Sequence, residues 1–244
     1  MGGDNRHNKR DTVAIIAAGG NGTRLDASGG KQLLEVAGKP VLSWTVDAIA
    51  AAESVDEVII ACDPKRVAEY ASAVSRSVST RKRISFVPGG LTRQMSVYSA
   101  LLEVKSHSIV IIHDGARPLI EPEVVEEAIE TLREGKADAL SGVVVGYPTI
   151  DTIKAVDESL IITSTPDRAT LWNAQTPQVF WTDELYDAYE YARTHGVKGT
   201  DDASLMEQFG KKVVMIKGPR DNIKITLEED IAFAQGILAL RVRE

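Results

Sequence analysis

The sequence predicts an α/β fold: a Rossmann-like, mostly parallel sheet with helices on both faces and a projecting β-hairpin arm. Short β-branched runs alternate with helical patterns up to residue 146, and such alternation is typical of parallel strands joined by crossover helices. The runs are short and rich in β-branched and other apolar residues, which indicates buried strands. From residue 147 the pattern changes to the alternation of a β-hairpin.

Five apolar runs predict strands of this sheet, and four segments between them carry helical spacing. The predicted strands are TVAIIA (12–17), EVIIAC (57–62), RISFV (83–87), SIVIIH (108–113) and DALSGVVVG (138–146). The predicted helices are residues 40–52, 64–76, 93–105 and 121–134. In such sheets ligands bind beyond the carboxyl ends of the strands, and polar clusters follow several of these runs.

The predicted arm covers residues 147 to about 180, where no segment is long enough for a crossover helix. A two-stranded arm is marginally stable alone, so we expect it to pack on a second copy of the chain. Beyond it the pattern predicts helices near 182–195 and 201–209, a strand at 212–216, and a last helix from about 227.

Length and composition indicate a single domain at residues 12–244, preceded by a polar, flexible N-terminus at residues 1–11. The 244 residues are 43% hydrophobic, enough for a sizeable core, and no repeat or linker interrupts them. The net charge of −7 argues against a nucleic-acid partner. The chain lacks an 18-residue apolar run and a secretory signal, which predicts no membrane association and a cytoplasmic location. The only cysteine, Cys62, lies in an apolar run and is expected to be a buried thiol.

The segment AAGGNGTRLDASGGKQ (17–32) follows the first predicted strand and has the character of a phosphate-binding loop. Glycines let backbone N–H groups approach an anion, while Arg24 and Lys31 add the positive charge that a phosphoryl group in transfer requires. Two common motifs are excluded. Leu25 and Gln32 occupy positions where a Walker A loop needs glycine and Ser or Thr, and Leu25 also replaces the third glycine of a dinucleotide fingerprint.

GGNGTRL followed by KQLL resembles the signature of nucleotidyltransferases that join a nucleotide to a sugar- or polyol-phosphate. Further stretches resemble the polyol-phosphate cytidylyltransferases, namely 2-C-methyl-D-erythritol 4-phosphate cytidylyltransferase and its ribitol-phosphate relatives. These stretches are GGLTRQMSV (89–97), HDGARP (113–118), DRATLWNAQTPQVF (167–180), and TDDAS (200–204) with DNIKIT (221–226). They run in the family's order and span nearly the whole chain from 12 to 240, which implies the nucleotidyltransferase fold.

The nucleotide side of the site is predicted around two glycine segments. In GGLTRQMSV the glycines let the backbone meet a flat base, and Ser96 is placed on the first turn of the next helix. A glycine turn with a capping serine would look the same. The resemblance implies that the backbone around Gly90 and Ser96 reads cytosine, although Leu91 replaces an acidic residue of some members. The nucleotide-binding set that it implies is Ala17, Ala18, Gly19, Gly22, Gly90, Ser96 and Gly115.

The acceptor side is predicted around HDGARP, where Asp114 and Arg117 leave a very apolar strand. An aspartate there can hold Mg²⁺ or a polyol hydroxyl, and an ion pair that stiffens the turn is the simpler alternative. The resemblance assigns Asp114, Arg117, Thr152, Arg168 and Thr200 to the acceptor, and makes Asp114 a candidate metal ligand. It also implies that Arg168 reaches in from a partner subunit, and therefore a homodimer formed through the β-arm.

The resemblance implies cytidylyl transfer from CTP to 2-C-methyl-D-erythritol 4-phosphate, with release of pyrophosphate, in isoprenoid precursor biosynthesis. The attacking phosphate oxygen is already anionic, so no general base is needed and catalysis reduces to alignment and charge neutralisation. Arg24 and Lys31 are the predicted catalytic residues, with Lys224 assisting. The expected cofactor is Mg²⁺, held largely by phosphate and water.

Two departures and three alternatives accompany this interpretation. The loop is one residue longer than in many members, through Gly20–Asn21, and Gly30 stands where the family usually has proline. Since a Pro-to-Gly change adds conformational freedom, we expect weaker CTP binding with activity retained. The alternatives are a ribitol-5-phosphate cytidylyltransferase, a sugar-1-phosphate nucleotidyltransferase that uses dTTP, UTP or GTP, and a silent nucleotide-binding module. Retention of Arg24 and Lys31 argues against the last.

Overall fold

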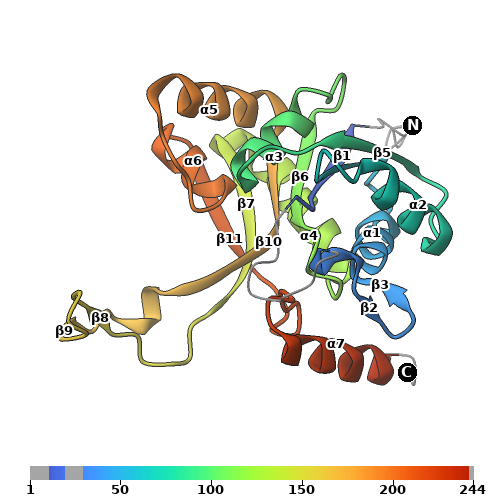
Figure 1. Cartoon of the computed structure of the whole chain (residues 1–244). Coiled ribbons are helices and arrows are strands. Elements are labelled where there is room, and N and C mark those ends of the chain that lie inside the picture. Colours follow the sequence, from blue (N-terminus) through green and yellow to red (C-terminus); the bar gives the residue numbers. More distant parts are fainter. Residues whose placement is uncertain (1–10, 20–29, 242–244) are drawn as a thin grey trace, which may run out of the picture.

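A seven-stranded sheet forms the centre of the molecule in the order β11–β7–β10–β6–β1–β4–β5 (Figure 1). The computed structural model describes residues 11–19 and 30–241. The strands are β1 Thr12–Ala17, β4 Glu57–Cys62, β5 Arg83–Pro88, β6 Ile109–Asp114, β7 Leu140–Pro148, β10 Trp172–Trp181 and β11 Lys212–Lys217. Only β10 runs antiparallel to its neighbours among these seven. The predicted α/β class and the presence of all five strands are confirmed. Four of the strands are buried as expected, for example at Ile109–Ile112, whereas burial of Arg83–Pro88 was expected wrongly, because this strand lies at the edge of the sheet.

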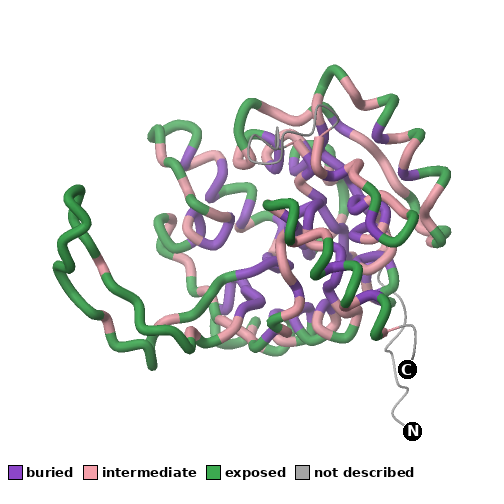
Figure 2. Tube along the Cα trace, turned by 60° about the horizontal axis from the view of Figure 1, so that its bottom comes forward, coloured by how far each residue is buried: buried purple, intermediate pink, exposed green. Residues whose placement is uncertain are grey.

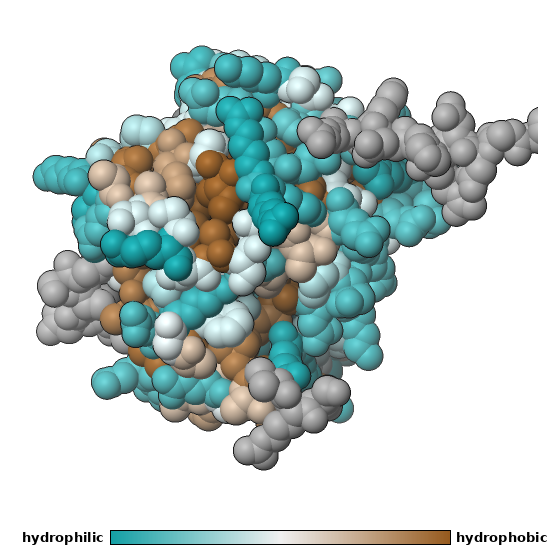
Figure 3. All heavy atoms as spheres, turned by 90° about the vertical axis from the view of Figure 1, so that its right-hand side faces the viewer, coloured by the Kyte–Doolittle hydropathy of each residue, from teal (hydrophilic) through white to brown (hydrophobic). Residues whose placement is uncertain are grey.

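Helices cover both faces of the sheet, as predicted. One core cluster packs α1 Val41–Ala51, α2 Val67–Ser77 and α4 Pro122–Glu134 on one face. A second packs α3 Arg93–Leu101, α5 Thr182–His195 and α6 Asp202–Gln208 on the other. Short 3-10 turns occur at Lys31–Leu33, Gly135–Asp138 and Arg168–Thr170. The edge strand β5 is only partly buried, and Figure 3, which views this side, shows apolar side chains between polar ones.

A third, smaller core lies below the sheet, where the last helix α7, Glu228–Arg241, packs on a short hairpin. The hairpin consists of β2 Glu35–Val36 and β3 Lys39–Pro40, which the sequence analysis did not predict. Val36, Leu119 and Ala234 are fully buried between these elements. The C-terminal segment is thereby attached next to the carboxyl end of β6.

The arm projects from the body and is exposed along most of its length (Figure 2). It contains the two-stranded sheet β8 Ala155–Val156 and β9 Ile162–Ser164. The arm is shorter than the predicted 147 to about 180, because Gln178 pairs with both Ile112 of β6 and Val144 of β7. Strands of the arm and of the sheet share a period of two residues, so the pattern alone could not locate the boundary.

The N-terminal boundary of the fold also differs from the expectation. Asp11, placed in the flexible segment 1–11, is tied to the body. Its carboxylate lies 2.8 Å from Arg133 Nη2, and its carbonyl accepts a hydrogen bond from the Ile109 N–H. Residues 1–10 lie outside the described residues.

Candidate active site

The carboxyl ends of four neighbouring strands form one continuous rim. Gly115 N–H donates to Ala17 O at 2.9 Å, Ala18 N–H donates to Ala61 O at 2.7 Å, and Gly89 N–H donates to Cys62 O at 2.7 Å. The chain continues from β1 toward β4 and β5 on one side, whereas β6 lies on the other, so the sheet changes direction here. Ligands of open α/β sheets bind at such a switch point.

A pocket of about 130 Å³ opens at this rim. Its described lining comes from the segment after β1, the turn before β2, the start of α3, the end of β6 and the C-terminal segment. The lining residues are Ala17, Gly19, Lys31, Gln32, Arg93, Ser96, Asp114, Gly115, Ala116 and Lys224. Seven of them were predicted site residues, which segments far apart in the sequence bring together.

Asp114, at the end of β6, is the centre of the charged side chains in this pocket. Arg93 Nε lies 3.0 Å from its Oδ1, while Lys224 Nζ lies 2.8 Å and Arg117 Nε 3.5 Å from its Oδ2. Burial alone would raise the pKa of Asp114, but the positive charges of Arg93, Lys224 and Arg117 outweigh it and hold the pKa well below its usual range. Asp114 is therefore a permanent anion that gathers three cations.

Arg117 shows the ion pair that the sequence analysis weighed as an alternative. Besides pairing with Asp114, it donates through Nη1 to Asn222 O at 2.8 Å. Burial lowers its pKa, and the neighbouring carboxylate of Asp114 partly offsets this effect. The arginine thus joins the end of β6 to the segment that carries Lys224.

Ser96 holds the second glycine segment against the pocket. Its buried Oγ accepts from Gly90 N–H at 3.1 Å and donates to Thr92 O at 2.9 Å, while Thr92 caps α3 by accepting from Met95 N–H. A Cβ on Gly90 would lie 2.3 Å from Met95 Cβ, so a side chain there would force the loop away from the helix. Both glycine and serine are therefore required by the local geometry.

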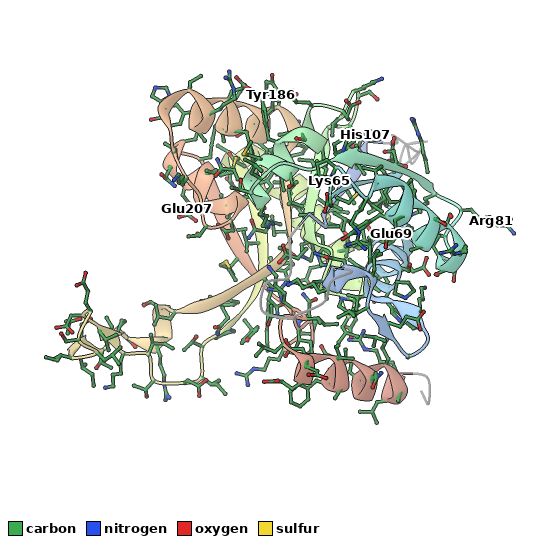
Figure 4. All side chains as sticks on the ribbon, viewed as in Figure 1. Lys65, Glu69, Arg81, His107, Tyr186 and Glu207 are labelled. Carbon is green, nitrogen blue, oxygen red and sulfur yellow. The ribbon has the colours of Figure 1, made fainter. Side chains whose placement is uncertain are left out.

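Lys31 enters the pocket from a short turn whose conformation depends on Gly30. Gly30 has a φ of 73°, and a Cβ there would lie 2.9 Å from Tyr70 Oη and 3.0 Å from Arg66 Nη1. Arg66 in turn pairs with Glu69, which Figure 4 labels on α2. The turn is thus pressed against α2 at a position where only glycine fits.

The start of α7 lies near Lys31. Asp230 accepts from the backbone N–H groups of Thr226 and Leu227 at 2.7 and 2.8 Å. Burial acts to raise the pKa of Asp230, but these hydrogen bonds and the nearby charge of Lys31 lower it. The C-terminal segment therefore forms one wall of the site.

His113 has a structural role. It is fully buried, with Nδ1 2.9 Å from Thr176 Oγ1 and Nε2 3.1 Å from Arg117 O. Burial lowers its pKa to about 4, so the ring is neutral at neutral pH. Thr176 also accepts from the Asp114 N–H at 3.0 Å, so β10 helps to fix the carboxyl end of β6.

Comparison with known proteins identifies the family. The model of IspD, 2-C-methyl-D-erythritol 4-phosphate cytidylyltransferase, matches residues 12–240. The chain belongs to this family. The cytidylyltransferase of this name from Caldanaerobacter subterraneus subsp. tengcongensis is 41% identical over 223 residues, which cover 91% of this chain and 96% of the relative. The one from Prochlorococcus marinus is 40% identical over 230 residues, covering 93% and 98%.

Solved structures of the family have the same fold. The crystal structure of 4-diphosphocytidyl-2C-methyl-D-erythritol synthase from Anaerococcus prevotii superposes with a TM-score of 0.81 at 30% identity, covering 94% of this chain and 96% of that one. The 2-C-methyl-D-erythritol 4-phosphate cytidylyltransferase from Thermus thermophilus gives a TM-score of 0.74 at 28% identity, covering 94% and 99%. The predicted nucleotidyltransferase fold is thereby confirmed.

Not all predicted residues of this family member are placed in the pocket. Arg24 and Gly22 fall outside the described residues, so the structure does not locate them. Thr152 and Arg168 are exposed on the arm, where Arg168 Nη1 donates to Ile150 O at 3.1 Å. Thr200 is exposed before α6, next to the capping residue of that helix. Their roles stay predictions.

Two residues that the sequence analysis passed over belong to the charged cluster. Arg93 bridges Asp114 and Asp202, and Asp202 is fully buried. Both lie inside quoted family stretches, Arg93 three residues before Ser96 and Asp202 within TDDAS. One sequence signal could have identified them: each is a charged residue on the first turn of a predicted helix that begins near the carboxyl ends of the strands.

Asp114 does not fit the predicted role of a magnesium ligand. Both of its oxygens contact cationic side chains, which compete with a metal ion for the same lone pairs. Within residues 11–19 and 30–241, no group of three or more His, Cys, Asp and Glu could hold a metal.

No helix within residues 11–19 and 30–241 is long and apolar enough to cross a membrane.

Proposed function

We propose that this chain transfers the cytidylyl group of CTP to 2-C-methyl-D-erythritol 4-phosphate and releases pyrophosphate. One observation carries the proposal: Lys31, Arg93 and Lys224 converge with two glycine segments on a single pocket at the switch point of the sheet. Such a convergence of cations suits a triphosphate and a second phosphate side by side. Membership of the family supports the choice of substrates.

The nucleotide binds between the first and the second glycine segment. Gly90, fixed by Ser96, presents its backbone to the cytosine, and Gly19 and Gly115 leave room for the nucleotide on the rim of the sheet. The triphosphate follows the segment from Gly19 to Lys31, including Arg24. This arrangement places the α-phosphorus near Lys31.

The acceptor binds on the other side of Asp114. The carboxylate accepts hydrogen bonds from polyol hydroxyls, while Arg117 and Lys224 attract the phosphate. Thr200, at the start of α6, lies on this side of the site. Thr152 and Arg168 come from the arm of a partner subunit, so the working form is a homodimer.

The exposed apolar side chains of the arm support this assembly. They are Ile150, Ile153, Val156, Leu160, Ile161 and Ile162, with exposed fractions from 41% to 79%. A row of this kind on a marginal hairpin is typical of a surface that a partner covers.

The reaction is an in-line displacement that needs no general base. An oxygen of the acceptor phosphate attacks the α-phosphorus of CTP, the bond from that phosphorus to the bridging oxygen breaks, and pyrophosphate leaves with the electron pair. Lys31 and Arg24, assisted by Lys224, stabilise the negative charge on the transferring group. Mg²⁺, when bound to the triphosphate, would screen its charge, and its ligands would be phosphate oxygens and water. We place the reaction in isoprenoid precursor biosynthesis and in the cytoplasm, where CTP is available.

The first test is pyrophosphate release with every pairing of CTP, UTP, dTTP or GTP with methylerythritol 4-phosphate, ribitol 5-phosphate or glucose 1-phosphate. Turnover only with CTP and methylerythritol 4-phosphate is expected. Lys31→Ala should then lower kcat by about 10²–10³. The matched control is Lys65→Ala, which removes an exposed lysine before α2 (Figure 4) and should leave kcat unchanged. Turnover with ribitol phosphate alone would overturn the acceptor assignment, and no turnover in any mixture would overturn the activity.

A further inference from the structure

Arg93 lies between two carboxylates that belong to different elements. Its Nε is 3.0 Å from Asp114 Oδ1 at the end of β6, and its Nη2 is 2.8 Å from Asp202 Oδ2 at the start of α6. Burial alone would lower the pKa of Arg93, but attraction by Asp202 and Asp114 outweighs it and raises the pKa. The guanidinium therefore stays charged and joins two helices of one face, α3 and α6, to the end of β6.

Asp202 is a fixed anchor for this arginine. Its side chain is fully buried, and the Tyr189 hydroxyl donates to its Oδ1 at 2.5 Å. Burial raises the pKa of Tyr189 well above its usual value, so the hydroxyl keeps its proton and remains a donor. The carboxylate also lies on the first turn of α6, where the partial positive charge of the helix favours an anion. Neither partner of Arg93 is free to rotate into solvent.

The contact with Arg93 fixes how Asp114 presents its second oxygen. Arg93 engages Oδ1, and Oδ2 receives Lys224 and Arg117, the two cations assigned to the acceptor phosphate. A buried ion pair is a weak source of stability, because the cost of desolvating both charges offsets most of their attraction. A chain of such pairs on the wall of a pocket therefore points to a geometric role.

We propose that Arg93, anchored on Asp202, is a positioning residue that holds Asp114, and through it Lys224 and Arg117, in the arrangement that receives the acceptor. The inference rests on the proposed function and names the residues that set its acceptor affinity. Arg93 lines the same pocket, and in the positioning role it acts through Asp114. The part of the site proposed to bind the nucleotide, at Gly90 and Ser96, does not depend on this chain of contacts.

Two conservative variants test this role. Arg93→Lys keeps one positive charge but cannot reach both carboxylates with a planar fork. Asp202→Asn keeps the shape of the anchor and removes its charge. Each should raise the KM for the acceptor about 10-fold, while the KM for CTP changes less than about 2-fold. The double variant should be no worse than Arg93→Lys alone, because both changes break the same chain of contacts.

Arg193→Gln is the matched control, since it removes an exposed arginine paired with Glu190 and should alter neither KM. Thermal unfolding checks that each variant folds. Equal changes in both KM values, or lower stability with unchanged KM values, would overturn the positioning role. If Arg93→Lys does not fold, Asp202→Asn alone decides the outcome by the same ratio of KM changes.

A binding measurement separates this inference from the proposed activity. Calorimetry with methylerythritol 4-phosphate, in the presence of α,β-methylene-CTP, reports acceptor affinity without turnover. If the wild type binds the acceptor but does not turn over, the activity fails, and the inference stands only if both variants weaken that binding about 10-fold. If the wild type neither binds nor turns over the acceptor, both are overturned.

Discussion

At the scale of single residues, Gly30 shows how one backbone dihedral angle changes the effect expected from a substitution. From the sequence, a glycine at the usual proline position loosens the loop and weakens CTP binding, and this effect stays a prediction. The structure adds that Gly30 has a φ of 73°, which a proline ring, fixed near −65°, cannot adopt. The glycine is therefore a requirement of the turn that carries Lys31.

Gly30→Pro, the change toward the usual family residue, should harm this protein. We expect the free energy of unfolding to fall by about 1–3 kcal/mol and kcat/KM for CTP to fall about 10-fold, because the turn must move Lys31. Steady-state kinetics and denaturant unfolding check this. Gly38→Pro is the control, since Gly38 has a φ of 75° but lies in the exposed β2–β3 turn. It should lose stability with kcat/KM unchanged, and improved CTP binding by Gly30→Pro would contradict the expectation.

The charged cluster shows what residue patterns can predict. Asp114 and Arg117 leave a buried strand at the ligand-binding edge, so their place in the site followed from the fold class, whereas Lys224 was assigned to the site by the family resemblance. The bridge from Arg93 to Asp202 followed from neither, because it joins positions 109 residues apart on two helices whose relative placement depends on packing. Residue type and spacing identify the groups at an edge, whereas tertiary packing decides which of them touch.

At the scale of elements, β6 ends at Asp114, to which we assign a role in acceptor binding, and is fixed from within by His113. This side chain is buried between Thr176 and the Arg117 carbonyl, and its pKa falls from 6.5 to about 4 because of burial. Folding therefore favours the neutral ring, and the unfolded chain binds more protons between these two pH values. Stability is full above pH 6.5 and is lost as the pH falls toward 4.

This linkage predicts a loss of about 3 kcal/mol in the free energy of unfolding between pH 7 and pH 4. Asp114 does not contribute in this window, since its lowered pKa shifts its own loss below pH 3.8. Urea unfolding of the wild type and of His113→Gln measures the difference. The variant is expected to be less stable at pH 7 but to lose most of this pH dependence. An unchanged slope in the variant would assign the effect to other groups.

The elements differ in how far the sequence determines them. The buried strands between helices were predictable because a short apolar run is stable mainly as a strand inside a sheet that helices cover on both faces. The β2–β3 hairpin was not, since two-residue strands carry no period, and the division of β10 between arm and sheet leaves no trace in alternation. Long, buried elements can be predicted from their own sequence pattern, whereas short elements form only because of the residues that pack on them.

At the scale of the whole molecule, the net charge of −7 contrasts with the cations gathered at the pocket. Anionic substrates are therefore attracted by local charge, within about a Debye length of 8–10 Å, rather than by the protein as a whole. The arm carries a further cation, Arg168, but the arm projects away from the α/β body of its own subunit. In a symmetric dimer each arm can complete the site of its partner.

Subunit mixing tests whether Arg168 acts across the dimer. Arg168→Ala and Lys31→Ala each disable both sites of their own homodimer, if each residue is needed. A mixed dimer then has one site with both defects and one intact site, since Lys31 of one subunit meets Arg168 of the other. Random exchange makes half of the dimers mixed, so activity should recover to about one quarter of the wild-type value.

The mixture is measured by pyrophosphate release after partial unfolding and refolding together, with each variant refolded alone as the control. Sedimentation confirms that the refolded species are dimers. Recovery is expected only from the mixture, because neither parent contains an intact pair. A mixture that stays as inactive as its parents, while dimers form, would mean that Arg168 serves its own subunit. An Arg168→Ala homodimer with wild-type activity would instead mean that Arg168 is not needed, and the acceptor phosphate would then depend on Arg117 and Lys224.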